Sequence, residues 1–344
     1  MQFALLHYSF TRYRVRVTGN PALIEEIRCE IAANGGHITF ACFMELALYH
    51  PQHGYYRCGQ MRTGKSGDYF TSVSTGPLFG RILAHHFQQL RQEIGNPPEF
   101  EIVEFGGHTG QLRADVLAAD PALPYRIVEA GQAPPDNITG IIFSNELLDA
   151  MPVHRVQVLH GQWVEIYVTA EGETTGPLSD TRLTGYLAGL PVGLMEGYRT
   201  EVNLRALDWL ADVARRLRRG YVITIDYGWE QNDYFAPHRH EGHLQCYYRH
   251  TKTGNPYEHV GEQDITTHVE FTGFIEQGRQ LGLETVLFTD QTHYLLQVGE
   301  SEISRIVTQT AGQFSKERAA IHQLIHPDHM GRAFKVLVQQ QLPT

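Results

Sequence analysis

The chain has 344 residues, of which 42% are hydrophobic, and a formal net charge of −10 from 28 basic and 38 acidic residues. This length can hold two domains or one α/β core with insertions, while the negative charge argues against a nucleic-acid partner and permits a cationic one. No apolar run approaches the roughly 20 residues of a membrane span, so we expect no membrane association.

The four cysteines form no C-x-x-C pair, which fits a reducing compartment, and we expect a cytoplasmic protein. Residues 1–24 contain three arginines and no acid. This pattern indicates either a transit segment, which would make the protein mitochondrial, or an irregular start of the chain, which we favour.

The first hundred residues are predicted to be mostly helical. Apolar residues at helical spacing predict helices over 21–33 and 40–49. A segment rich in Gly, Ser and Thr follows over 64–75. It precedes a third helix, over 79–94, whose apolar residues share one face and therefore belong to a core.

The central part of the chain alternates strands and helices. The predicted elements are a strand over 99–103, a helix over 111–119, strands over 125–129 and 141–143, a helix over 203–217 stopped by Gly220, and a strand over 221–225. This order predicts a parallel sheet flanked by helices, whose ligands bind at the carboxyl ends of the strands. We therefore expect one edge of the sheet to carry Glu104, Glu129, Asn145, Glu146 and Asp226.

Two segments interrupt the alternation. Residues 154–200 contain a predicted hairpin around His160 and Gly161, and residues 229–264 form a long stretch of irregular sequence rich in His, Tyr and Gly. The chain then continues with a helix near 271–281, a strand over 284–288, helical sequence to about 325 and a last strand over 334–338.

A glycine turn follows the first strand of the predicted sheet. Gly106, Gly107 and Gly110 let backbone N–H groups approach a ligand, and the next helix points its N-terminus at the same place. Glu129 ends the following strand, 25 residues after Glu104, where a carboxylate can accept hydrogen bonds from both hydroxyls of a ribose. The pattern favours a nucleoside cofactor, and a plain strand-to-helix connection is the alternative.

Several segments taken together resemble one family, the MidA-type S-adenosylmethionine-dependent methyltransferases. The matching segments are 46–56 (LALYHPQHGYY), 67–72 (GDYFTS), 104–110 (EFGGHTG), 144–153 (SNELLDAMPV), 225–228 (IDYG) and 261–271 (GEQDITTHVEF). The resemblance runs from about residue 21 to the C-terminus. It implies an α/β class I (Rossmann-like) methyltransferase sheet with an antiparallel seventh strand at 334–338, S-adenosyl-L-methionine as the cofactor, and an arginine of a protein partner as the methyl acceptor.

The resemblance also implies an organisation and a set of functional residues. Residues 1–95 would form an N-terminal helical segment with a loop that covers the cofactor, and 96–344 a methyltransferase-like core with insertions at 154–200 and 229–267. The implied cofactor contacts are Thr71, Ser72, Glu104, Gly106, Gly107, Gly110, Glu129 and Asn145. The implied roles beside the transferred methyl group fall on Glu146 and Asp149, and Asp264, Thr266 and His268 would line the substrate cleft, with His268 as the functional histidine.

Three departures from the family pattern stand out. Gly107 and His108 replace a proline and a glycine of the glycine turn, so a side chain enters space that the cofactor would use. His243 replaces the threonine of a Gly-Thr-Leu segment. Only 11 residues separate Glu129 from Ile141, which is too short for a full crossover, so we expect a helix and the third strand of the fold to be missing.

The residue types allow other interpretations. Without the surrounding motif, Glu146 and Asp149 would be interpreted as a solvated loop pair or as helix-capping acids. The histidines at 238, 240 and 243 could suggest a zinc site, but no paired carboxylate or cysteine accompanies them, so we expect no metal. Two other functions stay open: a catalytically impaired relative that acts as an assembly or interaction factor, and a nicotinamide oxidoreductase, which the glycine spacing disfavours.

Overall fold

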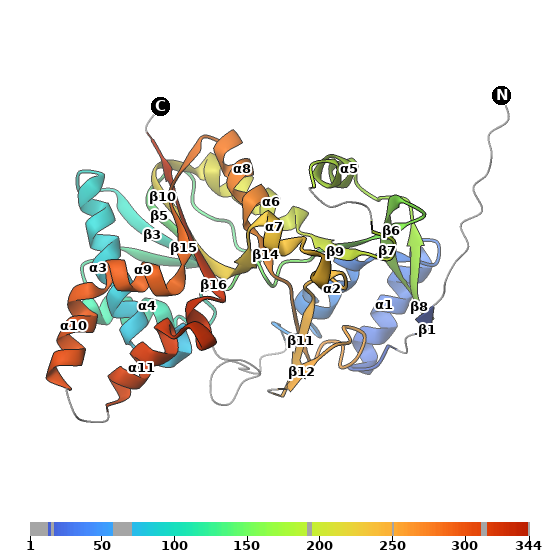
Figure 1. The fold of residues 1–344 in the computed structure, drawn as a ribbon, viewed down its shortest axis with the longest axis horizontal. Helices are drawn as coiled ribbons and strands as arrows, with labels where there is room; N and C mark the ends of the chain where they lie inside the picture. The colour runs from blue at the N-terminus through green and yellow to red at the C-terminus, as the bar shows by residue number, and fades with distance from the viewer. Residues whose placement is uncertain are drawn as a thin grey trace.

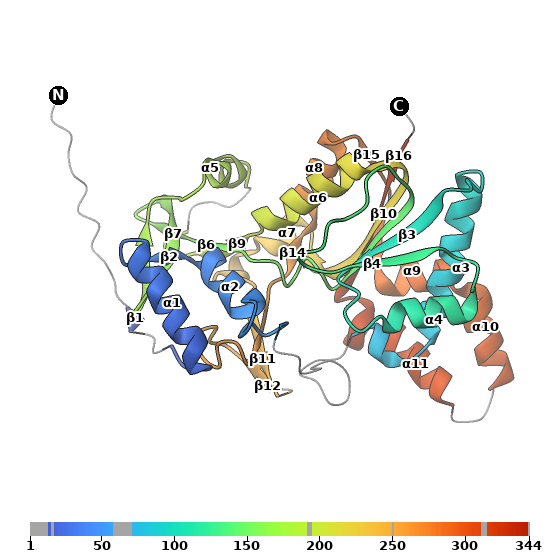
Figure 2. The same cartoon turned by 180° about the vertical axis from the view of Figure 1, so that it is seen from behind.

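The structure of the protein, a computed structural model, describes residues 13–14, 17–57, 71–190, 195–249, 251–310 and 315–342. The basic start of the chain at 1–12 and most of the Gly/Ser/Thr-rich segment, at 64–70, lie outside these residues. The described chain forms a large unit around a long twisted sheet and a smaller unit beside it (Figure 1), and Figure 2 shows the same two units from behind.

The helices are α1 (Pro21–Ala33), α2 (Phe40–Tyr49), α3 (Leu78–Glu93), α4 (Gln111–Ala119), α5 (Thr181–Ala188), α6 (Leu204–Arg216), α7 (Gln231–Tyr234), α8 (Phe271–Gln280), α9 (Gln291–Val298), α10 (Glu300–Gln309) and α11 (Lys316–Ile325), with shorter turns at η2 (Val73–Thr75), η3 (Pro237–Arg239) and η4 (Pro327–Gly331). The strands are β1 (Tyr13–Arg14), β2 (Ile38–Thr39), β3 (Phe100–Phe105), β4 (Tyr125–Val128), β5 (Ile138–Asn145), β6 (His154–Leu159), β7 (Gln162–Thr169), β8 (Gly172–Gly176), β9 (Arg199–Val202), β10 (Leu217–Trp229), β11 (Gln245–Tyr248), β12 (Thr251–Thr253), β13 (Asp264–Thr266), β14 (Val269–Glu270), β15 (Leu283–Asp290) and β16 (Phe334–Gln341).

The main sheet has the order β4-β3-β5-β10-β16-β15. Strands β3, β4, β5 and β10 are parallel, whereas β16 runs antiparallel to both of its neighbours. The expected α/β class I sheet and its antiparallel seventh strand are therefore confirmed. The expectation for the connection after Glu129 also agrees with the fold, since residues 129–137 lead from β4 to β5 through turns, without a helix or strand.

Alternating residues of the central strands pack on opposite faces of the sheet, as the period of two requires. Ile102, Ile141 and Ile223 face the side covered by α3, α4, α9, α10 and α11. Their neighbours Val103, Ile142 and Val222 face the side covered by α6 and α8. Both faces of the central strands are thus buried, which explains their nearly continuous apolar sequence.

The smaller unit joins segments that are distant in the sequence. Strand β2 pairs antiparallel with β7, which belongs to the hairpin predicted in the insertion at 154–200. Ile38 lies opposite Val168, and Thr39 lies opposite Tyr167. Helices α1 and α2 share a buried cluster with Val153, Val168, Tyr257 and Ile265. Strands β11, β12 and β13 make a three-stranded sheet from the stretch that the sequence suggested to be irregular.

These contacts group α1 and α2 with the inserted strands, and α3 with the main sheet. The sequence analysis instead divided the chain between residues 95 and 96, and this division into domains stays a prediction. We define the core unit as α3, α4, α6, α8 to α11 and the main sheet, and the small unit as α1, α2, α5, α7 and the two smaller sheets.

Gly220 does not end a helix, contrary to the sequence interpretation. Helix α6 ends at Arg216 and Gly220 lies inside β10, at φ 132°, opposite Gly140 of β5. A Cβ on Gly220 would lie 1.9 Å from the carbonyl oxygen of Gly140. The glycine is needed because two backbones approach closely there.

Gly220→Ala should therefore lower the free energy of unfolding by about 2 to 3 kcal/mol, because a central strand must move to make room. Gly185→Ala is the control: Gly185 lies within α5 with no atom within 4 Å of a built Cβ, so alanine should stabilise the protein by about 0.5 to 1 kcal/mol. Chemical denaturation measures both. Equal effects of the two substitutions would contradict the close approach of β5 and β10.

Candidate functional site

The carboxyl ends of four neighbouring strands meet at one edge of the main sheet. The register places Glu104 beside Ile127 and Phe143, and Asn145 opposite Ile225, one residue before Asp226. Glu104 and Asn145 thus lie at the ends of β3 and β5, Glu129 directly follows β4, and Asp226 lies at a similar level within β10. The four residues share one edge of the sheet, as the sequence predicted.

The glycine turn packs directly on the Glu104 carboxylate. Gly106 and Gly110 are both left-handed, at φ 72°, and a Cβ on Gly107 would lie 2.7 Å from Glu104 Oε2. Glu104 is only 4% exposed, and burial raises its pKa to about 7. The Tyr125 hydroxyl acts on the Glu104 carboxylate and opposes the rise of its pKa.

Glu129 is tied to the same turn. The backbone N–H of His108, which is left-handed at φ 48°, donates a 2.7 Å hydrogen bond to Glu129 Oε1. The side chain of His108 is exposed. The expected entry of this side chain into space that the cofactor would use stays a prediction.

Asn145 and Glu146 turn the chain away from β5. Glu146 is left-handed at φ 53°, a strained conformation for a side chain of this size. Its Oε1 accepts hydrogen bonds from Asn145 Nδ2 at 2.9 Å and from the backbone N–H of Ser72 at 3.3 Å. Burial raises the pKa of the Glu146 carboxyl to about 8. The buried oxygen Asn145 Oδ1 has no partner among the described residues.

Thr71 and Ser72 lie close to this turn but use their hydroxyls elsewhere. The Ser72 hydroxyl donates to Gln291 Oε1 at 3.0 Å inside the core, and Thr71 Oγ1 accepts from the Ser74 N–H at 3.1 Å. Only the backbone of Ser72 contacts Glu146. The implied cofactor contacts of these two residues stay predictions.

Asp226 anchors the turn that carries Asp149. Its Oδ2 accepts hydrogen bonds from the N–H groups of Leu147, Leu148 and Asp149 at 3.2, 2.8 and 3.3 Å, and Oδ1 accepts from Tyr227 N–H at 2.8 Å. Burial raises the pKa of Asp226 to about 7, and these four donors oppose that rise. These donors favour the ionised form of Asp226.

Asp149 has no such donors for one of its oxygens. Its side chain is 6% exposed, and Oδ1 has no hydrogen-bond partner among the described residues. Burial, followed by the charges of Asp226, Glu146 and Asp264, raises the pKa of Asp149 well above its ordinary value. A buried carboxyl of this kind is neutralised either by a proton or by a cation.

The small unit completes the acidic cluster, which we define as Glu146, Asp149, Asp226 and Asp264. The Tyr56 hydroxyl donates to Asp264 Oδ1 at 2.7 Å, and the Thr267 N–H donates to the Asp149 carbonyl at 2.8 Å. Sequence reasoning missed this contact because 208 residues separate the two partners. The cluster thus lies where the core unit and the small unit meet.

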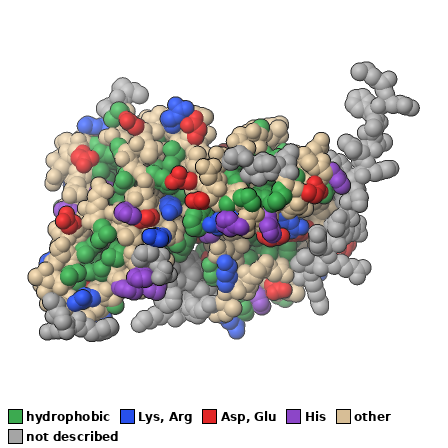
Figure 3. Space-filling view, viewed as in Figure 1, with side chains coloured by type: hydrophobic (Ala, Val, Ile, Leu, Met, Phe, Trp, Pro, Cys, Tyr) green, Lys and Arg blue, Asp and Glu red, His purple; other side chains and the backbone are tan. Residues whose placement is uncertain are grey.

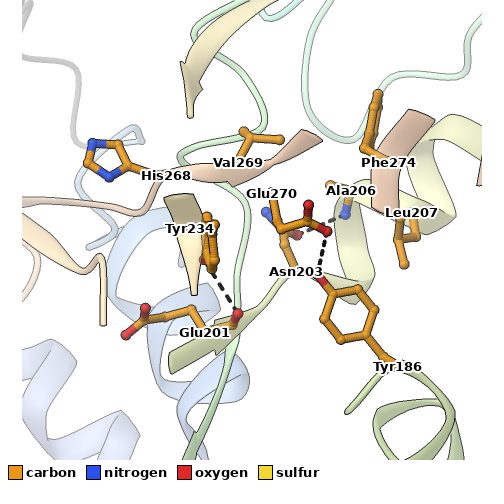
Figure 4. Close-up of a pocket in the computed structure, with 10 residues that line it drawn as sticks. All are labelled: Tyr186, Glu201, Asn203, Ala206, Leu207, Tyr234, His268, Val269, Glu270 and Phe274. Atoms are coloured by element: carbon orange, nitrogen blue, oxygen red, sulfur yellow. Dashed lines mark hydrogen bonds between the residues drawn. The ribbon is translucent and has the colours of Figure 1, made fainter. Parts of the chain in front are cut away.

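His268 lies beside the cluster in a shell of aromatic side chains. Its ring contacts Trp229 at a centroid distance of 6.0 Å and His243 at 5.3 Å. Burial lowers the pKa of His268 to about 3, so the ring is neutral at pH 7. Figure 4 shows His268 and Tyr234 at one side of a small pocket, with Glu270 and Tyr186 hydrogen-bonded to each other at the other side.

The surface near the junction of the units carries mixed charge. Figure 3 shows basic, acidic and histidine side chains gathered across the middle of this face. Within the described part of the chain, no group of three or more His, Cys, Asp or Glu side chains is arranged to hold a metal ion, and the absence of a metal role stays a prediction. None of the described helices is long and apolar enough to cross a membrane.

The strand order, the glycine turn and the acidic strand ends together define a class I methyltransferase fold. Residues 122–289 match the family model described as "Putative S-adenosyl-L-methionine-dependent methyltransferase". A crystal structure described as a "likely methyl transferase from Burkholderia thailandensis bound to S-adenosyl-homocysteine" is 31% identical, with a TM-score of 0.86 over 95% of each chain.

The chain therefore belongs to this family of S-adenosylmethionine-dependent methyltransferases, and the resemblance drawn from the sequence is confirmed. The mitochondrial protein arginine methyltransferase NDUFAF7 homolog of Drosophila melanogaster is 22% identical over 93% of this chain and 85% of its own length. The corresponding mitochondrial homolog of Caenorhabditis elegans is 23% identical over 90% of this chain and 82% of its own length.

The raised pKa of Glu104 predicts a pH-dependent stability. Because the folded state holds this proton up to about pH 7 and the unfolded state releases it near pH 4.5, stability falls as pH rises between these values. Glu104→Gln removes the effect, so the stability of the variant relative to the unmodified protein should rise by about 1 to 3 kcal/mol from pH 4.5 to pH 8. Denaturation at both pH values measures it, and a constant difference would contradict the assigned pKa.

Proposed function

We propose that this protein transfers a methyl group from S-adenosylmethionine to an arginine side chain of a protein partner. The observation that supports the acceptor is the buried Asp149 carboxyl, whose Oδ1 has no partner among the described residues while three other carboxyls surround it. A guanidinium is planar and carries five N–H donors, so it can neutralise several carboxylates at once. The names of the curated relatives point to the same acceptor.

The expected cofactor residues fit a bound nucleoside. The buried oxygen Asn145 Oδ1 lacks a partner among the described residues, and Gly106 and Gly110 give the turn before α4 its left-handed conformation. We propose that Glu129 accepts the ribose hydroxyls and that Glu104 and the turn hold the rest of the cofactor. S-adenosylmethionine would supply a methyl group activated by a sulfonium.

The acidic cluster would orient the acceptor. Methyl transfer is an in-line displacement, so most of the acceleration comes from positioning. Glu146 and Asp149 would hold two N–H groups of the guanidinium and thereby turn one nitrogen toward the methyl group. When the new C–N bond forms, that nitrogen loses a proton, and either carboxylate is placed to accept it. The neutral His268 ring adds no positive charge that would repel the acceptor.

The compartment of this protein is also a proposal. The curated relatives named above are mitochondrial by their names, and Arg12 and Arg16 at the start of the chain lie outside the described residues. We propose a mitochondrial location for this chain, in place of the cytoplasmic one first expected. Neither the oligomeric state nor the absence of nucleic acid is tested by these observations, and the second of these stays a prediction.

Calorimetric titration with S-adenosylmethionine tests the cofactor. The unmodified protein should bind it, and Glu129→Ala should weaken binding about tenfold or more, because it removes charged hydrogen-bond acceptors. Glu171→Ala is the control, since Glu171 is exposed in the turn before β8. An unmodified protein that releases no heat at any practical concentration would favour the interaction factor over the enzyme.

Asp149→Asn separates cofactor binding from turnover. This variant should bind S-adenosylmethionine as tightly as the unmodified protein and should lose most methyl transfer, since its amide cannot accept the proton or balance the acceptor's charge. Transfer of tritiated methyl groups to an extract from cells lacking the protein measures turnover. Weakened cofactor binding with intact turnover would mean that the roles assigned to Glu129 and Asp149 are reversed.

Turnover should rise with pH. The guanidinium stays protonated throughout the accessible range, whereas Glu146 ionises near pH 8 and Asp149 and Asp226 share its surroundings. The ratio kcat/KM for the acceptor should therefore increase as pH passes through about 8, because the acceptor binds to the ionised cluster. Glu146→Gln should remove this step and lower the plateau. A profile of the unmodified protein that falls above pH 7 would contradict this account.

A further inference from the structure

A continuous line of hydrogen-bonding groups runs through the small unit and ends at Tyr247, whose strand partner is Asp264 of the acidic cluster. It begins at the Tyr234 carbonyl, passes through the rings of His243 and His268 and the amide of Gln245, and ends at the Tyr247 hydroxyl. Four heavy-atom distances join these groups, at 2.8, 3.1, 3.3 and 2.6 Å. The position of each proton follows from the chemistry of its partners.

The first proton is assigned by the carbonyl. His243 Nε2 lies 2.8 Å from the Tyr234 oxygen, which can only accept, so Nε2 carries a proton. The ring is stacked on Tyr234 at a centroid distance of 3.8 Å and is buried. Burial lowers the pKa of His243 to about 4, so the ring is neutral at pH 7 and its Nδ1 is an acceptor.

The remaining protons then point one way. His268 Nδ1 lies 3.1 Å from the accepting Nδ1 of His243, so it must carry the proton of the His268 ring. His268 Nε2 is then an acceptor, which matches the amide nitrogen of Gln245 at 3.3 Å. The amide oxygen of Gln245 accepts the Tyr247 O–H at 2.6 Å. Every group in the line thus has one consistent role.

A competing contact exists at His268. The Trp229 indole N–H also lies 3.3 Å from His268 Nδ1, and it can donate there only if that nitrogen has no proton. His243 would then have to donate to His268 from Nδ1 while Nε2 donates to the Tyr234 oxygen. With a proton on both nitrogens, the His243 ring would be a cation. Both rings are buried, and the charged groups that act on them, Arg239, Lys252 and His238, all lower their pKa. The neutral arrangement is therefore favoured.

The end of the line faces the acidic cluster. Tyr247 lies in β11 directly opposite Asp264 of β13, so their side chains are neighbours on one face of the sheet. Burial, followed by the charges of Asp264 and Asp149, raises the pKa of Tyr247, so the hydroxyl lies within the field of these two carboxylates. Since its proton is donated to Gln245, the oxygen keeps its lone pairs for an incoming donor.

We propose that the Tyr247 oxygen accepts an N–H of the cationic methyl acceptor, and that His243 and His268 are positioning residues that fix its polarity through Gln245. This inference rests on the proposed function, because it assigns a further contact to the same acceptor. A reversed line would present the Tyr247 proton to the substrate cation and oppose its binding.

Nitrogen NMR of the full-length, histidine-labelled protein tests the line without any turnover. The His268 signals are assigned as those that disappear in the variant His268→Gln. At pH 7.5 these signals should show that the His268 ring carries its proton on Nδ1. His243→Phe keeps the stack on Tyr234 but removes the acceptor, so the His268 proton should move to Nε2. His243→Gln can donate to Tyr234 and accept from His268, and should restore the Nδ1 form. A proton on Nε2 in the unmodified protein, or one unmoved by His243→Phe, would overturn the inference.

Kinetics test the substrate contact. Tyr247→Phe should lower kcat/KM for the acceptor about tenfold or more through the loss of one hydrogen bond to a charged group, with unchanged affinity for S-adenosylmethionine. His243→Phe should lower it similarly, and His243→Gln should recover it. Tyr248→Phe is the matched control, because the neighbouring Tyr248 is stacked on His259 at 3.8 Å. Equal activity of Tyr247→Phe and Tyr248→Phe would refute the contact.

The two experiments also separate this inference from the function on which it rests. A protein that binds no S-adenosylmethionine in the calorimeter would refute the methyltransferase proposal while leaving the NMR result for His268 interpretable. A protein that binds the cofactor and methylates an extract, but shows His268 protonated on Nε2, would keep the function and remove the role of His243 and Tyr247.

Discussion

The carboxylate of Asp226 is the interaction on which the site depends. It lies within the central strand β10 and accepts hydrogen bonds from three backbone N–H groups of the turn that follows β5, at 2.8 to 3.3 Å. A charged acceptor bound by several donors is among the stronger hydrogen-bonding arrangements in a protein. It holds the 147–149 turn against the sheet edge and so places Asp149 beside Glu146, whose backbone is itself strained at φ 53°.

This construction leaves more buried negative charge than the described residues balance. The pKa values of Glu146 and Asp149 are raised because burial penalises their charged forms and each carboxylate opposes the ionisation of the next. In the absence of a partner the cluster holds protons, and a guanidinium would replace them. Burying these carboxylates without a partner lowers the stability of the protein, and the same burial favours the binding of a cation. Such perturbed carboxyls are typical of functional sites.

The small unit supplies the second half of the site. Asp264 and Tyr247 come from the three-stranded sheet and Tyr56 from the turn after α2. Thr267 links this unit to Asp149 by a backbone hydrogen bond of 2.8 Å. Behind them, Arg155 and Arg199 pair with Glu173, and Arg155 also approaches Glu201, which accepts the backbone N–H of His243. A network of this kind holds the long segment 231–268 in place, since its members come from four separate parts of the chain.

The sequence by itself determined the parallel sheet, its antiparallel last strand, the shortened connection after Glu129 and the sharing of one edge by Glu104, Glu129, Asn145 and Asp226. These features are local, because strand period, glycine turns and the ends of strands are read over a few residues. The tertiary structure alone decided that Gly220 serves a close approach of two strands, that Asp149 is buried without a partner for Oδ1, and that Tyr56 and Tyr247 belong to the acidic cluster. Burial, and with it the ionisation of each carboxyl, depends on contacts between residues up to two hundred positions apart, and no local pattern contains them.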